Sequence, residues 1–471
     1  MSEILKRNHE TPLLLTEAVG EFAQMPEANF QAYESFKPIA TIANQQRQAF
    51  LAEEIVNPKP GLADIDETLL SESTNRLQRL LGLVETGIDD SPIRIDAFYE
   101  IIAERLASYY FVRQANRVNK MDSNSPEYDY EVNRLQELND SLYGQPEKEV
   151  FDTLVAEEID IANHALTVAG SDIERQIVSE YLDLLPNTEM ESRQHYLPKD
   201  STVIHYQQLV KEYYAEVLDA LEIDDSRSYE PADMVELFQQ SIDTLDIKNW
   251  RAEIEIGGTN LNTDQANQIV NIGETRKAIN GKTLRGLILH EVGVHVLRRA
   301  KGEETDNPLL YNLGLAGYYT NEEGLGKFVE QALAGEASVA GINHYLNASL
   351  SLGLDGVPRD FREVYEIAWR RAIVAKIGQG DHIDETVINS AKLTAYNSVF
   401  RVRRGFPADV KGVAFTKDLA YFNGTANIWH FLEKNIGDEG ILERVLIGKH
   451  DPLRADHVEL VKDASKNIRV G

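Results

Sequence analysis

Apolar residues recur with a helical period through the first half of the chain. The three- and four-residue spacing of these side chains predicts amphipathic helices. The clearest helical stretches lie at 16–25, 65–85, 97–118 and 207–221. Proline, glycine and polar clusters interrupt them at 56–62, 121–130, 142–148 and 184–190. We therefore expect residues 1–190 to form a helical N-terminal region.

The period changes near residue 246, where strands are predicted. Residues 251–256 alternate, with Ala252, Ile254 and Ile256 on one side and charged residues on the other. This alternation predicts a half-buried strand, and residues 268–274 predict a second short one. An exposed edge at 251–256 or 268–273 is a candidate for binding an extended peptide by backbone pairing, with plain sheet structure as the alternative.

The predicted strands lead directly into an apolar helical run at residues 280–302. Asn280 and Thr283 are candidate caps at its start, and cationic residues before Gly302 suit its end. Further helices are predicted at 321–353, 361–378 and 384–400, followed by a glycine- and basic-rich stretch at 401–424. The pattern predicts an α+β, mostly helical fold, with residues 191–471 as a second region that holds a small sheet.

Composition narrows the class of protein. The chain has 471 residues, of which 42% are hydrophobic and 26% charged, as in soluble proteins of two or three lobes. No apolar run reaches the roughly 18 residues of a membrane span, and the opening residues lack the pattern of a secretion signal. The absence of cysteine excludes disulfides, thiolate ligands and a cysteine nucleophile. We expect a cytoplasmic protein without a membrane partner.

The net charge of −30 also restricts the partners. A strongly acidic surface repels nucleic acid and anionic membranes at long range, so we expect no nucleic-acid partner. An acidic protein tail would be repelled in the same way unless the site itself formed a local basic island.

The apolar run at 280–302 carries the candidate chemistry. Residues 290–295 read HEVGVH, whereas the zinc-protease signature H-E-x-x-H places its histidines four residues apart. Here His290 and His295 are five apart, with Glu291 beside the first. A glutamate in that position, not bound to the metal, can take a proton from water and pass it to a leaving amine.

The extra residue raises a geometric problem. Five residues rotate the second side chain by about 140° around an ideal α-helix, too far for two imidazoles to share one ion easily. A local widening, such as a π-type bulge, would bring the rings together, and Gly293 would ease it. Two histidines on a partly buried helix without a metal remain the alternative at this point.

A catalytic zinc takes three protein ligands and leaves a fourth position for water. Residues 320–335 read TNEEGLGKFVEQALAG, with Glu322 and Glu323 at the start of a helical pattern. Acidic residues there ordinarily serve as capping or helix-dipole partners. A carboxylate on the next helix, 28 residues after His295, would also suit the third ligand position.

HEVGVH followed by NEEGLG resembles the motifs of a zinc carboxypeptidase family. The family includes the microtubule-associated tyrosine carboxypeptidases and bacterial proteins labelled flavohaemoglobin expression-modulating QEGLA motif proteins. Its second motif usually ends in alanine, where this chain has Gly326. The resemblance implies a zincin-like catalytic domain with Zn²⁺ held by His290, His295 and Glu323. It implies that Glu291 is the general base.

Two later segments extend the resemblance, which covers roughly residues 190–430. YNSVFRVRRGFP, at 396–407, is similar to a family segment with two arginines three apart before a glycine. AFTKDLAYFNG, at 414–424, is similar to F-[ST]-K-D-x-x-Y-x-x-G. The matching positions are Arg401, Arg404, Gly405, Lys417, Asp418, Tyr421 and Gly424.

These residues suit recognition of a peptide C-terminus. Arginine binds a carboxylate bidentately and lysine supplies a point charge, so Arg401, Arg404 or Lys417 is expected to hold the terminal carboxylate. Tyr421 is expected to stabilise the oxyanion or to line the side-chain pocket. The alternative for the basic cluster at 401–405 is a solvated loop or a set of salt-bridge partners for nearby acids. The alternatives for the other residues are a core tyrosine at 421 and a structural ion pair between Lys417 and Asp418.

We therefore expect a zinc-dependent metallocarboxypeptidase that removes a C-terminal residue, such as tyrosine or methionine, from a peptide or protein. A zinc endopeptidase or aminopeptidase remains an alternative, as does a non-catalytic regulatory or scaffolding protein that zinc stabilises. The charge of −30 argues against a tubulin-like acidic tail as substrate.

Overall fold

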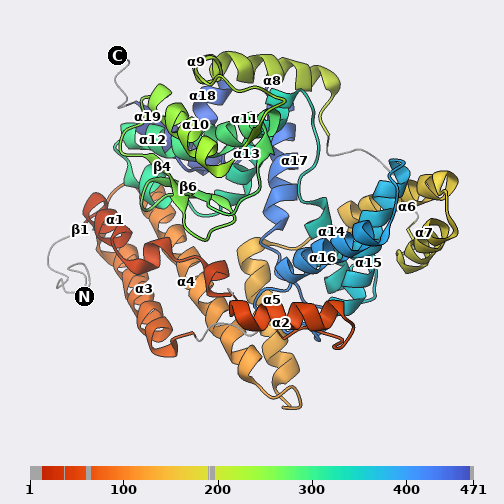
Figure 1. The fold of residues 1–471 in the computed structure, drawn as a ribbon. Coiled ribbons are helices and arrows are strands. Elements are labelled where there is room, and N and C mark those ends of the chain that lie inside the picture. The colour runs from red at the N-terminus through yellow and green to blue at the C-terminus, as the bar shows by residue number, and fades with distance from the viewer. Residues whose placement is uncertain (1–12, 37, 60–64, 189, 191–196, 467–471) are drawn as a thin grey trace.

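The computed structural model describes residues 13–36, 38–59, 65–188, 190 and 197–466. Helices account for 65% of the structure and strands for 5%, which confirms the α+β, mostly helical prediction. Three buried hydrophobic clusters organise the elements (Figure 1). Within these ranges, every helix is either too short or too polar to cross a bilayer.

The first cluster is built mainly by N-terminal helices, drawn in red and orange in Figure 1. Phe22, Phe98 and Phe111 are fully buried in it, and segments from the second half of the chain complete it. The elements are β1 (Leu13–Leu14), α1 (Leu15–Ala23), η2 (Pro26–Asn29), η3 (Ala32–Phe36), α3 (Glu67–Gly87), β2 (Ile88–Asp89), α4 (Pro92–Lys120), α5 (Tyr128–Tyr143), η5 (Leu309–Leu313) and α19 (Ala455–Ser465).

Another cluster joins early and late helices on the right of Figure 1. Phe50 is fully buried there, with its ring 5.1 Å from Phe361 and 5.3 Å from Tyr396. The predicted domain boundary between residues 190 and 191 adjoins residues outside the described ranges and stays a prediction. The elements are α2 (Ala40–Leu51), α6 (Lys148–Val168), α7 (Asp172–Leu184), α14 (Ile342–Leu352), α15 (Phe361–Gly378) and α16 (Glu385–Arg401).

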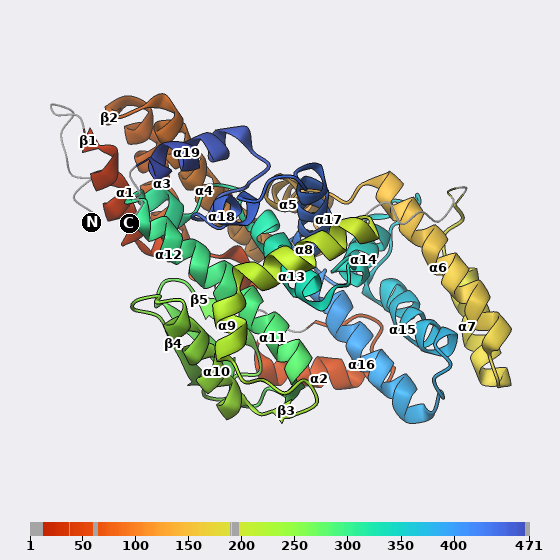
Figure 2. The same cartoon turned by 90° about the horizontal axis from the view of Figure 1, so that it is seen from above.

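The remaining cluster carries the histidine motif. α11, η4 and α12 form one continuous helix, and α13 and α10 pack against it (Figure 2). The elements are α8 (Asp200–Tyr213), α9 (Ala215–Ala220), β3 (Ser228–Tyr229), α10 (Pro231–Thr244), β4 (Arg251–Glu255), β5 (Leu261–Asp264), β6 (Ile269–Gly273), β7 (Ile279–Asn280), α11 (Gly281–His290), η4 (Glu291–Val296), α12 (Leu297–Glu304), α13 (Tyr319–Ala334), α17 (Leu419–Lys434) and α18 (Ile441–Val445).

The small sheet beside the motif helix has the order β4-β6-β5. β4 pairs parallel to β6, and β5 pairs antiparallel to it. The two predicted strands are confirmed as β4 and β6, whereas β5 was not predicted. Because β6 is paired on both sides, 268–273 offers no free edge for a peptide, and the alternative of plain sheet structure is confirmed there. β4 lies at an edge of the sheet, so peptide binding at 251–256 stays a prediction.

The predicted burial of β4 is also wrong. Ile254 is 36% exposed and Ile256, just after the strand, is 88% exposed. Alternation shows which side chains share a face, but only a covering layer makes that face buried. β4 is an edge strand that packs on α10, where the amide of Ala252 donates to Oε1 of Gln239 at 2.9 Å.

The predicted cap of the motif helix is confirmed. The side chain of Asn280 accepts a hydrogen bond from the amide of Thr283 at 2.9 Å. The helix runs on to Glu304 rather than ending at Gly302. At Gly302 an added Cβ would lie 3.0 Å from the Cα of Gly448. The glycine therefore lets the segment that holds Gly448 pack closely against the helix.

Helices α13 and α17 cross with their backbones in contact at two glycines. An added Cβ at Gly324 would lie 2.2 Å from the carbonyl oxygen of Gly424. One at Gly424 would lie 2.0 Å from the carbonyl oxygen of Thr320. Because backbone atoms cannot yield as side-chain ends do, this crossing fixes the separation of the two helices.

Substituting Gly424→Ala is expected to force α13 and α17 apart. Overpacking of this kind lowers the free energy of unfolding by roughly 1–3 kcal/mol, which chemical denaturation measures. Gly82→Ala, at an exposed position of helix α3 with open space around the new Cβ, is the matched control. It is expected to leave the free energy of unfolding unchanged or to raise it, and equal destabilisation by both would contradict the crossing as the cause.

Candidate active site

One turn of π-helix brings the two motif histidines to the same side of their helix. This turn, η4, spans Glu291–Val296, and it confirms the widening that the five-residue spacing predicts. The ring centroids of His290 and His295 lie 5.0 Å apart, and both side chains are buried.

Tyr214, at the junction of α8 and α9, supports this turn. Its hydroxyl donates to the carbonyl oxygen of Gly293 at 2.7 Å, and its side chain is 1% exposed. An added Cβ at Gly293 would lie 3.0–3.3 Å from three atoms of Tyr214. The glycine thus admits the tyrosine, and the tyrosine satisfies a carbonyl in the widened turn.

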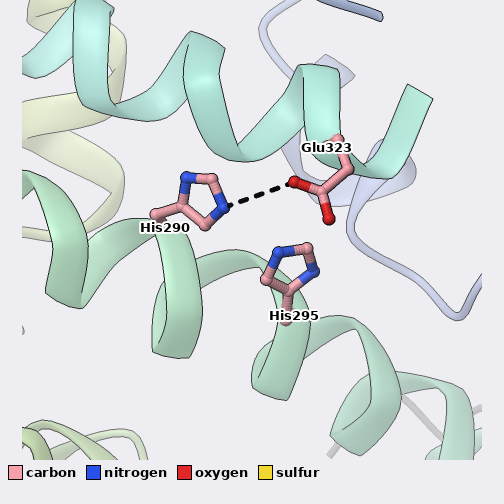
Figure 3. A group of neighbouring side chains, drawn as sticks. All are labelled: His290, His295 and Glu323. Carbon is pink, nitrogen blue, oxygen red and sulfur yellow. Dashed lines mark ion pairs between the residues drawn. The ribbon is translucent and has the colours of Figure 1, made fainter. Parts of the chain in front are cut away.

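Glu323 faces the histidine pair from the first turns of α13 (Figure 3). Its Oε2 lies 3.9 Å from Nε2 of His290. His290, His295 and Glu323 each offer a ligand atom, and these three atoms lie within 4.8 Å of one another. Ligand atoms around a tetrahedral zinc lie about 3.4 Å apart, so small side-chain movements would close this set around an ion.

A carboxylate holds the other nitrogen of each imidazole. Nδ1 of His290 donates to Oε1 of Glu330 at 2.5 Å, and Nδ1 of His295 donates to Oε1 of Glu322 at 2.8 Å. Such partners fix the orientation of metal-binding histidines and raise their basicity. Because both Nδ1 atoms are engaged, both Nε2 atoms are left for a common ligand, and the residues present fit a zinc ion.

Gly326 gives α13 its close approach to His290. An added Cβ there would lie 2.6–2.8 Å from three ring atoms of the histidine. The alanine usual in the resembling family would therefore require the ring of His290 to shift in this chain.

Buried charges determine the protonation states of His295 and Glu322, which are hydrogen-bonded to each other. Burial would lower the pKa of His295, but the hydrogen bond to Glu322 and the charges of nearby glutamates raise it to about 9. Burial would raise the pKa of Glu322, but the guanidinium of Arg298 and the imidazole of His295 lower it to about 2. Nη1 of Arg298 donates to Glu322 at 3.2 Å. Glu322 is thus held ionised behind the imidazole.

Glu291 is oriented by the sheet edge. Its Oε2 accepts a hydrogen bond from the hydroxyl of Thr263 on β5 at 2.6 Å. β5 is the edge strand that packs on η4, and it lines the same cavity as the histidines. Of the two edge strands of the sheet, β4 and β5, it is therefore β5 that lies beside the histidines.

A cavity of about 760 Å³ opens over these residues. One wall is formed by β5 and the turn after it, and another by η5 and the start of α13. His290, Glu291, His295, Glu323 and Tyr421 all line it. A cavity of this volume matches the size range of peptide and small-molecule sites.

Tyr421 reaches the cavity from α17. The negative charge of Glu323, together with burial, raises the pKa of the Tyr421 hydroxyl above its usual value. Tyr421 is hydrogen-bonded to Tyr319, which accepts a hydrogen bond from Nζ of Lys417 at 2.7 Å. The phenol therefore stays protonated at neutral pH and is a competent hydrogen-bond donor.

The three predicted carboxylate-binding cations are absent from the cavity wall. Nζ of Lys417 donates to the hydroxyl of Tyr319, which itself lines the cavity. Nε of Arg401 donates to Asp418 at 2.8 Å. Arg404 lines a separate cavity of about 340 Å³. The Arg401–Asp418 ion pair bears out the alternative of a structural partner for one basic residue. The substrate-binding roles of the three cations stay predictions.

Several residues of the site were not found from the sequence. Glu330 follows Glu323 by seven residues, or two helical turns. This spacing places both carboxylates on one face of the helix and is a sequence signal that Glu330 belongs to the site. The sequence indicates a capping or helix-dipole role for Glu322, or a less suitable metal ligand than Glu323, and does not predict its hydrogen bond with His295. Thr263 and Tyr214 carried no signal, because their roles depend on segments that meet only in the fold.

Tyr214→Phe is expected to loosen the π turn. Leaving the Gly293 carbonyl unsatisfied lowers the free energy of unfolding by about 1 kcal/mol. Because the turn fixes the positions of both imidazoles, the affinity for zinc is expected to fall about tenfold. Competition with a chelator measures this affinity.

Tyr206→Phe is the matched control for this experiment. The hydroxyl of Tyr206 is buried and donates to the carbonyl of Leu432 at 2.8 Å, away from the turn. It is expected to lose similar stability and to keep its zinc affinity. Equal zinc affinity in the two variants would contradict a role of Tyr214 in setting the turn.

Comparison with known proteins bears on the C-terminal part of the site. No curated protein and no solved structure matches the chain significantly. Residues 383–467, from α16 to α19, match the family described as microtubule-associated tyrosine carboxypeptidase. This segment contains Tyr421 and the predicted cations, whereas the histidine motif lies outside it. The resemblance to this carboxypeptidase family is thus confirmed over residues 383–467.

Proposed function

We propose that the protein is a zinc-dependent metallocarboxypeptidase that removes a C-terminal residue from a peptide or protein in the cytoplasm. The observation that carries this proposal is the convergence of His290, His295 and Glu323, with a carboxylate on the far nitrogen of each imidazole. Three ligands with an open fourth position are typical of catalytic rather than structural zinc. The match of residues 383–467 supports the carboxypeptidase class.

Zinc held by these three residues would act as a Lewis acid and lower the pKa of a water molecule in the cavity. Glu291 lies next to His290 in the chain and lines the same cavity. In the proposed mechanism its carboxylate accepts a proton from the attacking water and later delivers it to the nitrogen of the leaving amine. The hydrogen bond from Thr263 orients this carboxylate for both transfers.

Tyr421 is proposed to donate a hydrogen bond to the oxyanion that develops on the scissile carbonyl. Its raised pKa keeps the hydroxyl proton in place at neutral pH. A donor fixed before the reaction stabilises the developing charge without reorganisation. The hydrogen bond to Tyr319 holds the phenol in position.

Glu291→Gln tests the proposed mechanism. The variant is expected to lose at least about 1,000-fold in hydrolysis, because the amide cannot accept the proton from water. Its zinc content, measured by elemental analysis, is expected to remain one per chain. Glu323→Gln is expected to lose zinc as well, since a ligand is weakened.

The substrates for this test are peptides that differ in their last residue, followed by mass spectrometry. Loss of one C-terminal residue, suppressed by a chelator, is the expected result. Internal cleavage would favour an endopeptidase, and loss of the first residue an aminopeptidase. Bound zinc with no hydrolysis by the unaltered protein would favour the scaffolding alternative.

Zinc binding is expected to release protons and to strengthen with pH. The pKa of His295, about 9 against an ordinary 6.5, means that its imidazole carries two protons at pH 7. Its Nε2 proton must leave before a metal binds. Apparent affinity should therefore rise by about tenfold per pH unit up to about pH 9 and then level off.

Calorimetry in buffers of different ionisation enthalpy measures the protons released. Glu322→Gln removes the charge that raises the pKa of His295. This variant is expected to release fewer protons at pH 7 than the unaltered protein. Equal release by both proteins would show that Glu322 does not hold the proton on His295.

A further inference from the structure

Lys449 places a buried cation on the wall of the active-site cavity. Its backbone is held on both sides: the amide donates to the carbonyl of Leu310 at 2.7 Å, and the carbonyl accepts from Leu315 at 2.9 Å. Its side chain is 3% exposed. Two backbone bonds therefore fix a lysine where it faces the cavity rather than solvent.

The ammonium of Lys449 forms no hydrogen bond or ion pair with any residue that the structure describes. Other cations of the same cavity are engaged. Nζ of Lys327 pairs with Glu330 at 2.8 Å. Nε of Arg105 donates to the carbonyl of Ala28 at 3.0 Å, and its Nη1 pairs with Glu104 at 3.1 Å. An unpaired buried charge is costly, so its retention points to an anionic partner that arrives from outside.

The surroundings of Lys449 suit a carboxylate. Arg105 lines the same cavity, but its charge is paired with Glu104, which leaves Lys449 as the cation available there within the described ranges. Lys449 itself is buried, and burial strengthens attraction between opposite charges. Burial lowers the pKa of Lys449 to about 8, although the charge of Glu322 raises it. The carboxylate of Glu322 is hydrogen-bonded to His295 and Arg298.

We propose that Lys449 anchors the C-terminal carboxylate of the peptide substrate. This inference rests on the proposed function, because it concerns the same cavity and the same reaction. A cation at a fixed place beyond the scissile bond lets only a chain that ends there bind productively. The lysine therefore restricts cleavage to the last residue, which gives an acidic protein a local means of holding an anionic end.

The test compares peptide acids with their amides in a zinc-loaded Glu291→Gln background, which binds without cleaving. The probes are N-acetyl-Ala-Ala-Tyr and N-acetyl-Ala-Ala-Met, each with a free or an amidated C-terminus, and calorimetry gives the dissociation constants. The free acids are expected to bind about 10- to 100-fold more tightly than the amides. Adding Lys449→Met is expected to reduce this ratio to about threefold or less, mainly by weakening binding of the acids.

Three further variants make the comparison decisive. Lys301→Met is the matched control, because Lys301 pairs with Glu443 at 2.5 Å and does not line the cavity; its ratio should stay unchanged. Lys449→Gln removes the charge but keeps polarity, so it repeats the test if Lys449→Met folds poorly. Lys417→Met tests the anchor predicted from the sequence, and a ratio that collapses there but survives Lys449→Met would overturn the inference.

The outcomes separate this inference from the proposed function. A preference for acids that survives in both Lys449 variants would overturn the role of Lys449, even with full carboxypeptidase activity in the unaltered protein. Equal binding of acids and amides by the Glu291→Gln background would overturn it too. Failure of the proposed function shows instead as an absence of hydrolysis by the unaltered protein across the peptide library.

Discussion

One widened helical turn is the constraint on which the candidate site depends. His290 and His295 are five residues apart, so a regular α-helix would point them in different directions. The π turn Glu291–Val296 brings their rings to 5.0 Å. Because widened turns pack and hydrogen-bond less well than α-helix, this one needs support, and the hydroxyl of Tyr214 on the carbonyl of Gly293 supplies it. The two imidazoles are then in place before any ligand arrives.

The distribution of charge follows from this arrangement. Glu322 and Glu330 lie behind the imidazoles, where Arg298 and Lys327 neutralise them. All four glutamates line the cavity, but Glu291 and Glu323 form no ion pair with a lysine or arginine that the structure describes. The negative charge on the Nδ1 side of the imidazoles is balanced, whereas the negative charge on the Nε2 side is not. The unbalanced charge attracts a cation to the point between the two imidazoles. The same wall would repel an acidic peptide, so an anionic substrate needs cations of its own elsewhere in the cavity.

The glycine crossing of α13 and α17 joins the two parts of the site. Gly324 and Gly424 let the backbones touch, which sets Glu323 and Tyr421 on the same cavity. The histidine motif lies on one side of this crossing and the segment that matches the carboxypeptidase family lies on the other. This rigid backbone contact therefore fixes the position of Glu323 relative to Tyr421, although the two residues come from distant stretches of the sequence.

The sequence determined the helical character, two strands of the three-stranded sheet and the need for a widened turn, because period and motif spacing are local properties. It also pointed to Glu323 through a resemblance of motifs. Only the tertiary structure decided that Ile256 is exposed and that β5 is the edge beside the cavity. It also decided that Lys449 lines the site without a hydrogen-bond or ion-pair partner among the described residues. Burial, strand order and the partner of a charge are set by segments far apart in the chain, and a local pattern carries no record of which segments will meet.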